Sequence, residues 1–138
     1  MFDHCLYFNT SALARLVERE WGAAYAPFEL TPPQGFALRV ILRQPGLLHR
    51  ELAEVLGIAR PTATRLIDHL VAKGWVERRT AEGDRRESQL FPTQAADALR
   101  DPLEKASRTV DTRLRGQIGS AEFESTVGAM RAVRGTLA

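Results

Sequence analysis

The sequence predicts a mainly α-helical protein with a small β-hairpin wing: a winged helix-turn-helix with additional helices at both ends. Three observations predict this fold. Two short amphipathic segments meet at a tight turn after Gly57, which is the pattern of a helix-turn-helix. Two strand-like segments with turn residues between them come directly afterwards. Long segments of helical periodicity flank this central part, and 138 residues suffice for one domain with appended helices.

The first predicted helix covers residues 6 to about 26. Its apolar residues are spaced by seven and four, which is one stripe of a long helix. They are Leu6, Leu13, Val17, Ala24 and Phe28.

The second predicted helix covers roughly residues 32–43. Thr31 is a suitable N-cap, Pro32 fits the first helical position, and Gln34 completes a capping box. The segment Gln-Pro-Gly at 44–46 ends the helix. We expect its inward side chains to be Phe36, Val40 and Ile41.

The helix-turn-helix is predicted from residues 48–74. A short helix over 48–56 is followed by Gly57, where a left-handed residue is favoured, and Pro61 opens the next helix, which Gly74 ends. The expected buried residues of the short helix are Leu52, Val55 and Leu56. Those of the following helix are Ala63, Leu66, Ile67, Leu70 and Val71.

The wing and the C-terminal helices come next. Residues 75–79 and 88–91 are strand candidates, and Gly83-Asp84 supplies the turn between them. Thr93 is placed to cap the next segment, and a long helix is predicted with an apolar stripe from Leu99 to Leu114. The segment 116–120 interrupts it before a last helix with Phe123, Val127, Met130, Val133 and Leu137 on one stripe.

The terminal helices carry apolar stripes that need a cover, either the central unit or another copy of the chain. Pairing between two copies would give a two-fold homodimer. We therefore expect an N-terminal dimerisation helix in residues 1–30, a central unit in 31–93 and C-terminal dimerisation helices in 94–138.

Positive charge is concentrated in the central unit. Between Arg60 and Arg86 there are seven basic and four acidic residues, a net charge of +3, whereas the rest of the chain has 12 basic and 13 acidic residues, a net charge of −1. Of the 19 basic residues 17 are arginine, the side chain suited to two-pronged contact with phosphate or guanine. A local excess of this size is also typical of a solvated face. Together with the helix-turn-helix and the basic hairpin it predicts that residues 31–93 are a DNA-binding domain.

The polar side of the fourth helix provides candidate base contacts. Thr62, Arg65 and His69 lie opposite the apolar stripe, Arg60 sits just before the helix, and Thr64 flanks it. In a helix-turn-helix the second helix enters the major groove with its N-terminal residues toward the base edges. We therefore expect this helix to read DNA, with His69 as a phosphate contact or plain surface.

The hairpin would then lie beside the DNA. Arg85 and Arg86 at its tip are predicted to reach an adjacent minor groove, where arginine meets enhanced negative potential. Asp84 is predicted to orient Arg86 or an arginine of the fourth helix. We expect phosphate contacts from Lys73, Arg78 and Arg79.

The stretch ELAEVLGIARPTATRLIDHLVAKGWVERRTAEGDRRES, residues 51–88, resembles the core of the MarR family of bacterial transcriptional regulators. The shared features are the Leu-Ala-x-x-Leu helix at 52–56, Leu-x-x-x-Gly at 70–74, Val-Glu-Arg-Arg at 76–79 and Asp-x-Arg at 84–86. "LTPPQ" at 30–34 also matches the family. Three positions differ from it: Leu48 and Ala59 replace polar helix caps, and the usual glycine is missing from "FPTQAA" at 91–96.

The resemblance implies a homodimer that binds pseudo-palindromic double-stranded DNA and in most cases represses nearby genes. A small phenolic or lipophilic effector, or an oxidant, would release the DNA. It also implies that Arg60, Thr62, Thr64 and Arg65 face the major groove and Arg86 the minor groove.

Two alternatives remain open. The organic-hydroperoxide-sensing branch of the family has a reactive cysteine in its first helix near tyrosines of the partner subunit, and Cys5 lies near the start of the first helix here, with Tyr7 and Tyr25 in the same segment. Alternatively, the winged helix serves protein–protein contact without DNA binding.

Other classes of protein have little support. The three histidines have no zinc-ligand spacing, and no catalytic group, cofactor motif, membrane span or secretory signal is present in the sequence, so we expect no enzyme activity, metal or cofactor. The single cysteine excludes an internal disulfide. Together these features predict a cytoplasmic protein.

Overall fold

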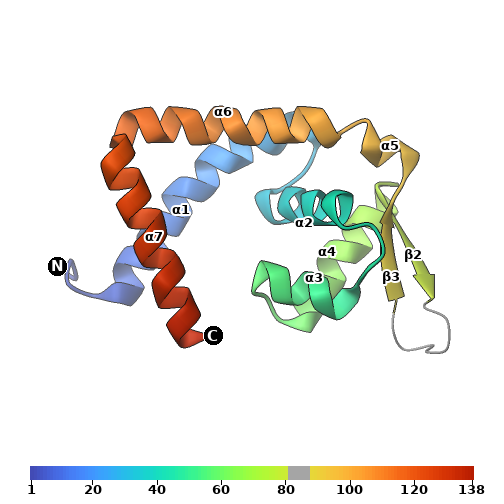
Figure 1. Ribbon diagram of the computed structural model, residues 1–138, viewed down its shortest axis with the longest axis horizontal. Coiled ribbons are helices and arrows are strands. Elements are labelled where there is room, and N and C mark those ends of the chain that lie inside the picture. The colour runs from blue at the N-terminus through green and yellow to red at the C-terminus, as the bar shows by residue number, and fades with distance from the viewer. Residues whose placement is uncertain (81–87) are drawn as a thin grey trace.

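A computed structural model describes residues 1–80 and 88–138. Helix α6 (Arg100–Ile118) forms a rod along one edge of the molecule, and helix α7 (Ser120–Leu137) turns back from its end (Figure 1). Helix α1 (Leu6–Tyr25) packs against α6, and a short 3₁₀ helix, η1 (Ala26–Phe28), comes directly after it. The remaining helices and the sheet lie below the other end of α6, so the winged helix-turn-helix fold predicted from the sequence is confirmed (Figure 1).

Helix α2 (Pro32–Arg43) lies at the centre of the core. It begins at the predicted capping box, in which the Thr31 hydroxyl accepts from the Gln34 amide at 3.3 Å and the Gln34 side chain accepts from the Thr31 amide at 3.1 Å. Its residues Leu38 and Ile41 are completely buried. Because α2 packs against α3, α4, α6 and β3, it is the helix on which the central unit is assembled.

The helix-turn-helix consists of α3 (His49–Leu56) and α4 (Arg60–Ala72). Gly57 adopts a φ of +66° directly after α3, the left-handed conformation that glycine tolerates without steric cost, as the sequence predicts. As expected, neither Leu48 nor Ala59 provides a side-chain cap for the helix that begins after it.

The wing strands β2 (Val76–Thr80) and β3 (Ser88–Pro92) pair antiparallel, with Arg78 opposite Leu90. A third strand, β1 (Leu47–Leu48), pairs with β3 on its other side, which gives the strand order β1-β3-β2. Strand β1 is not predicted from the sequence, because two residues are too few for an alternating pattern.

Two predicted core residues are wrong. Val55 is 51% exposed, because the inward face of the eight-residue helix α3 is centred between Leu52 and Ala53, and Val55 lies more than a quarter turn away from it. Phe36 is 37% exposed and lies at the rim of the core, where its ring packs edge-on against Trp21 with centroids 5.2 Å apart.

The connection from the wing to α6 is built without the glycine that the resemblance leads one to expect. The Thr93 hydroxyl accepts from the Ala96 amide at 3.2 Å and donates to the Gly74 carbonyl at 2.7 Å. Thr93 thereby caps a single-turn helix, α5 (Gln94–Asp97), as predicted, and α6 starts three residues later. The break between the two C-terminal helices is shorter than the predicted segment 116–120, since only Gly119, with φ of +98°, separates α6 from α7.

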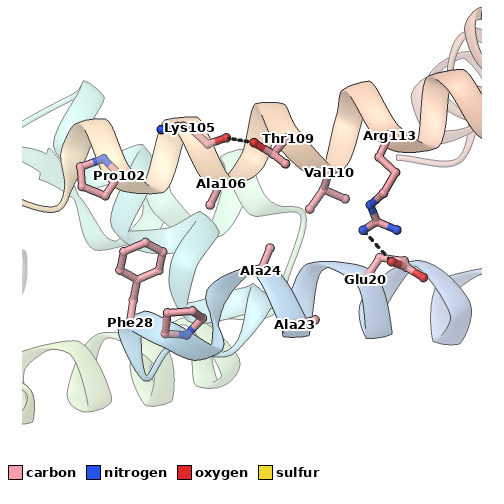
Figure 2. Close-up of a pocket in the computed structure, with 11 residues that line it drawn as sticks. Glu20, Ala23, Ala24, Phe28, Pro102, Lys105, Ala106, Thr109, Val110 and Arg113 are labelled. Carbon is pink, nitrogen blue, oxygen red and sulfur yellow. Dashed lines mark hydrogen bonds and ion pairs between the residues drawn. The ribbon is translucent and has the colours of Figure 1, made fainter.

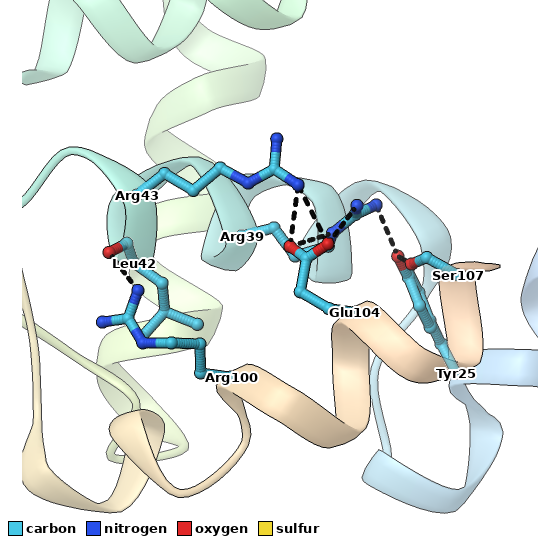
Figure 3. A network of polar contacts seen from close by, with 7 residues as sticks. All are labelled: Tyr25, Arg39, Leu42, Arg43, Arg100, Glu104 and Ser107. Atoms are coloured by element: carbon cyan, nitrogen blue, oxygen red, sulfur yellow. Dashed lines mark hydrogen bonds and ion pairs between the residues drawn. The ribbon is translucent and has the colours of Figure 1, made fainter.

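A polar network joins α1, α2 and α6 (Figure 3). Arg39 of α2 donates two hydrogen bonds of 3.0 Å to the Glu104 carboxylate of α6, and Arg43 donates to the same carboxylate at 2.9 Å. Arg39 also donates to the Tyr25 hydroxyl at 3.2 Å, which bonds to the Ser107 hydroxyl at 2.7 Å. The network holds α1 and α6 against the central unit.

Helices α1 and α7 expose several apolar side chains. Helix α7 has no buried residue, and Met130 and Val133 of α7 are 40% and 39% exposed. On α1, Leu13 and Leu16 are 37% and 52% exposed. A groove of about 320 Å³ runs between α1, α6 and α7. Within residues 1–80 and 88–138, no helix is both long and apolar enough to cross a membrane.

Candidate nucleic-acid interface

Helix α4 places one side in the core and leaves the opposite side in solvent. Ala63, Ile67 and Leu70 are fully buried, as their spacing predicts. Arg65 and His69 are exposed on the other side. Arg60 is also exposed, at the first turn of the helix, where backbone N–H groups have no partner within the helix. Since the N-terminal end of α4 is open, it can approach an extended anionic surface.

The two threonines of α4 lie on opposite flanks of this exposed side. Thr62 is half-buried, and its hydroxyl accepts a long contact of 3.5 Å from Arg65. Thr64 is also half-buried, but its hydroxyl bonds to the Arg60 carbonyl at 3.0 Å and to Nε2 of His49 at 3.1 Å. The two side chains therefore differ in how much hydrogen-bonding capacity is left for a ligand.

His49 was not predicted as a site residue. It stands at the start of α3 and connects that helix to α4 through Thr64. Burial lowers the pKa of His49, and the nearby charges of Arg78 and Arg60 lower it further, so we expect a neutral imidazole at pH 7. The sequence carries no signal for this role, because the residue is separated from Thr64 by 15 positions.

The basic residues of strand β2 point to opposite faces of the sheet, as alternation along a strand requires. Arg78 forms an ion pair with Asp68 of α4, a partner that the sequence analysis did not identify. Arg79 lies over the Phe91 ring at 4.0 Å from its centroid and pairs with Glu77 at 3.3 Å. Arg78 therefore lies on the side of the recognition helix, and Arg79 lies on the far face of the wing.

Lys73 lies at the C-terminal end of α4, where its ammonium donates to the Glu29 carbonyl behind η1. The side chain is exposed, so it adds positive charge at the end of α4 opposite to Arg60. The predicted tip residues Asp84, Arg85 and Arg86 lie outside the described residues.

Cys5 is a half-buried free cysteine that precedes the first turn of α1. Tyr7 is 80% exposed, whereas Tyr25 is completely buried at the far end of the same helix and bonded to Ser107 and Arg39. Twenty helical residues span about 30 Å, so Tyr25 does not meet Cys5 within one chain. Within residues 1–80 and 88–138 we find no cluster of three or more potential metal ligands.

A cavity of about 560 Å³ opens between α6 and the end of α1 with η1 (Figure 2). Ala24 and Phe28 line it from one side and Ala106 and Val110 from the other, as Figure 2 shows. At one end Arg113 pairs with Glu20 at 2.7 Å. The volume is in the range of small-molecule sites in proteins, which are about 300–1,000 Å³.

Similarity to known proteins agrees with this geometry. A sequence model described as the MarR family matches residues 28–87, from the last residue of η1 to the position before β3. The transcriptional repressor CouR, solved bound to a 23-mer DNA duplex, is 25% identical, with a TM-score of 0.86 over 95% of this chain and 93% of that chain.

Two further structures share the fold at lower identity. The MepR–DNA complex from S. aureus is 18% identical, with a TM-score of 0.83 over 97% of this chain and 98% of that chain. A MarR transcriptional regulator from Methanosarcina mazei Go1 is 22% identical, with a TM-score of 0.80 over 95% of this chain and 94% of that chain. Residues 28–87 thus match the MarR family, and the whole fold agrees with that of MarR-family transcriptional regulators.

Proposed function

We propose that this protein is a cytoplasmic, homodimeric repressor that binds a pseudo-palindromic operator and leaves it when a small effector binds. The observation that carries the proposal is the exposed N-terminal half of α4 with Arg60 and Arg65, next to a basic wing. A helix presented in this way has the shape and charge to enter a major groove.

The proposed roles of the individual site residues are those expected from the sequence. Arg60, Thr62, Thr64 and Arg65 contact the major groove. Arg86 enters the minor groove, with Asp84 orienting it. The remaining basic side chains contact phosphates; they are His69, Lys73, Arg78, Arg79 and Arg85. For Arg78 the ion pair with Asp68 supports a fixed position beside α4.

We further propose that residues 31–93 are the DNA-binding domain and that 1–30 and 94–138 hold the dimer together. This division is supported by the exposed apolar side chains of α1 and α7 and by the groove between them. Helix α7 has no buried residue, so its apolar side chains stay in contact with water unless another surface covers them. A second copy that supplies its own α1 and α7 would bury both surfaces about a two-fold axis.

The effector of this proposal is a small lipophilic or phenolic compound. The cavity between α1 and α6 is a suitable site, since it is largely apolar and lies between two helices of the proposed dimerisation segments that both contact α2 of the DNA-binding domain. A ligand shifts the occupancy of DNA only by its differential affinity for the DNA-bound and free geometries of the dimer, about 1.4 kcal/mol for each tenfold change.

The test is a titration of fluorescent DNA from the protein's own upstream region, beside a scrambled duplex of equal length at one physiological salt concentration. We expect at least about a thousandfold preference for the upstream DNA. Arg65→Ala should reduce that preference by about 1–3 kcal/mol for each base interaction that it removes. Lys73→Ala should weaken binding to both duplexes and reduce the salt dependence.

Arg108→Ala is the matched control, because it removes one positive charge from an exposed position of α6, away from α4 and outside the cavity lining. It should leave both affinities unchanged. Equal, weak binding of the wild type to the two duplexes, repeated with a pool of random sequences, would refute the proposal in favour of a protein-interaction module.

A further inference from the structure

The hydroxyl of Thr64 is fully occupied as a donor within the protein. A threonine hydroxyl has one proton to donate and two lone pairs. In Thr64 the oxygen lies 3.0 Å from the Arg60 carbonyl oxygen and 3.1 Å from His49 Nε2. Whichever tautomer His49 adopts, the one proton goes either to the carbonyl or to the imidazole nitrogen. Thr64 therefore cannot donate to a DNA base without breaking a bond inside the protein.

Thr62 differs in this respect. Its hydroxyl oxygen receives only the 3.5 Å contact from Arg65, and among the described residues nothing accepts its proton. It lies on the other flank of α4, one position before the buried Ala63. The hydroxyl of Thr62 is thus available to donate to an acceptor such as guanine O6 or thymine O4.

The bonding of Thr64 also fixes which part of the side chain is left to face a partner. Its oxygen is turned back along α4 toward the Arg60 carbonyl and sideways toward α3. The residue is only half-buried and its oxygen is engaged within the protein, which leaves the γ-methyl as the group of the side chain that is free to contact a partner. In the major groove the complementary feature is the C5-methyl group of thymine.

We infer that Thr64 is a specificity-determining residue that selects thymine by methyl contact, with His49 as the positioning residue that holds its hydroxyl away from the DNA. The two threonines then read DNA by different means: Thr62 through its hydroxyl and Thr64 through its methyl group. The inference rests on the proposed function, since it requires α4 to lie in the major groove.

The test uses a duplex that the wild-type protein selects from a random pool. Each thymine of a half-site is replaced in turn by deoxyuridine, which removes only the C5-methyl group. We expect one thymine in each half-site whose replacement weakens wild-type binding about fourfold, the effect of one methyl group no longer buried. Thr64→Ser, which removes the γ-methyl, should bind about fourfold more weakly per half-site and should no longer respond to that replacement.

Thr64→Val keeps both methyl-sized groups and removes the hydroxyl, so it should retain the affinity and the response to deoxyuridine. The matched change at Thr62 has the opposite expectation: Thr62→Val, which removes the hydroxyl that reads the base, should bind more weakly. His49→Gln gives the positioning readout, because a Thr64 hydroxyl freed from the imidazole should reduce the discrimination between thymine and deoxyuridine. Thermal melts of each variant confirm that it is folded.

Weak binding by Thr64→Val together with normal binding by Thr64→Ser would overturn the inference, since it would show that the hydroxyl reads the base. So would a Thr64→Ser variant that keeps the wild-type response to every deoxyuridine. In both cases the protein still selects DNA, and the proposed function stands. Failure of the wild type to select any sequence would refute the two together.

Discussion

Glu104→Gln should destabilise the protein in a pH-dependent way, because Glu104 joins α6 to α2. The hydrogen bond from Arg39 lowers the pKa of Glu104 from 4.5 to about 2, with the bond from Arg43 acting in the same direction and burial opposing it. Glutamine keeps the size of the side chain but removes the charge. It therefore resembles the protonated acid at every pH.

The size of the effect follows from that shift. A pKa lowered from 4.5 to about 2 corresponds to at most about 3 kcal/mol of folding free energy. Water screens part of this, since the side chain of Glu104 is 23% exposed and that of Arg43 is 62% exposed. We expect Glu104→Gln to lower the free energy of unfolding by about 1–2 kcal/mol at pH 7.

The sign of the pH dependence is set by the direction of the shift. A carboxylate whose pKa is lower in the folded state stabilises that state above its unfolded pKa, and the stabilisation is lost as the pH falls toward the folded value. The difference between wild type and Glu104→Gln should therefore be constant from pH 7 to about pH 5 and shrink as the pH falls from 4.5 toward 2.

The assay is urea unfolding monitored by circular dichroism, at one protein concentration and several pH values between 7 and 3. Asp97→Asn is the control, because both side chains of the 3.0 Å Asp97–Arg100 ion pair are exposed. This pair should contribute less than about 0.5 kcal/mol to the free energy of unfolding. A difference for Glu104→Gln that is absent at pH 7, or that stays unchanged down to pH 3, would refute the reasoning.

Three further predictions concern packing and assembly. Gly35→Ala should destabilise the protein by about 1–3 kcal/mol in thermal melts, because the new methyl group would lie 2.3 Å from the Tyr25 ring. Gly116→Ala is the control: its methyl group meets open space in α6, so it should stabilise the protein by about 0.5–1 kcal/mol. Tyr25→Phe should lower the free energy of unfolding by about 1–3 kcal/mol, since it leaves the buried Ser107 hydroxyl without the 2.7 Å bond to Tyr25; an unchanged urea midpoint would contradict this. Met130→Asp should shift the protein from dimer to monomer in analytical ultracentrifugation without loss of helix, because Met130 lines the groove of the proposed interface.

The elements of the central unit could be predicted because their signals are local. The capping box at Thr31 and the left-handed Gly57 are determined by neighbouring residues, and the structure confirms both. The buried side of α4 is encoded in a repeat of three and four residues and is also confirmed at Ala63, Ile67 and Leu70. The same method failed for Val55, because α3 has only eight residues and its period does not determine its orientation.

The partners of the candidate site residues could not be predicted, because they depend on tertiary contacts. Asp68 and Arg78 are ten residues apart and meet only after the chain turns from α4 into β2. Arg39 and Glu104 are separated by 65 residues, and no pattern in the sequence indicates that their helices, α2 and α6, pack together. From the sequence alone, a polar residue on the surface of a helix is predicted to face solvent, because the helix that packs against it is not known.

Helix α6 connects the proposed effector site with the DNA-binding domain through adjacent residues. Lys105 lines the cavity shared with α1, whereas Glu104, about 100° around the helix, is bonded to α2. The Tyr25–Ser107 bond joins α1 to α6 between these two surfaces and is completely enclosed. Because Arg39 bonds both to Tyr25 of α1 and to Glu104 of α6, a ligand that moves α6 relative to α1 would disturb at least one of these two contacts. The proposed effector would therefore act on the contacts of α2, and a stronger Arg39 network would require a larger difference in effector affinity between the two geometries.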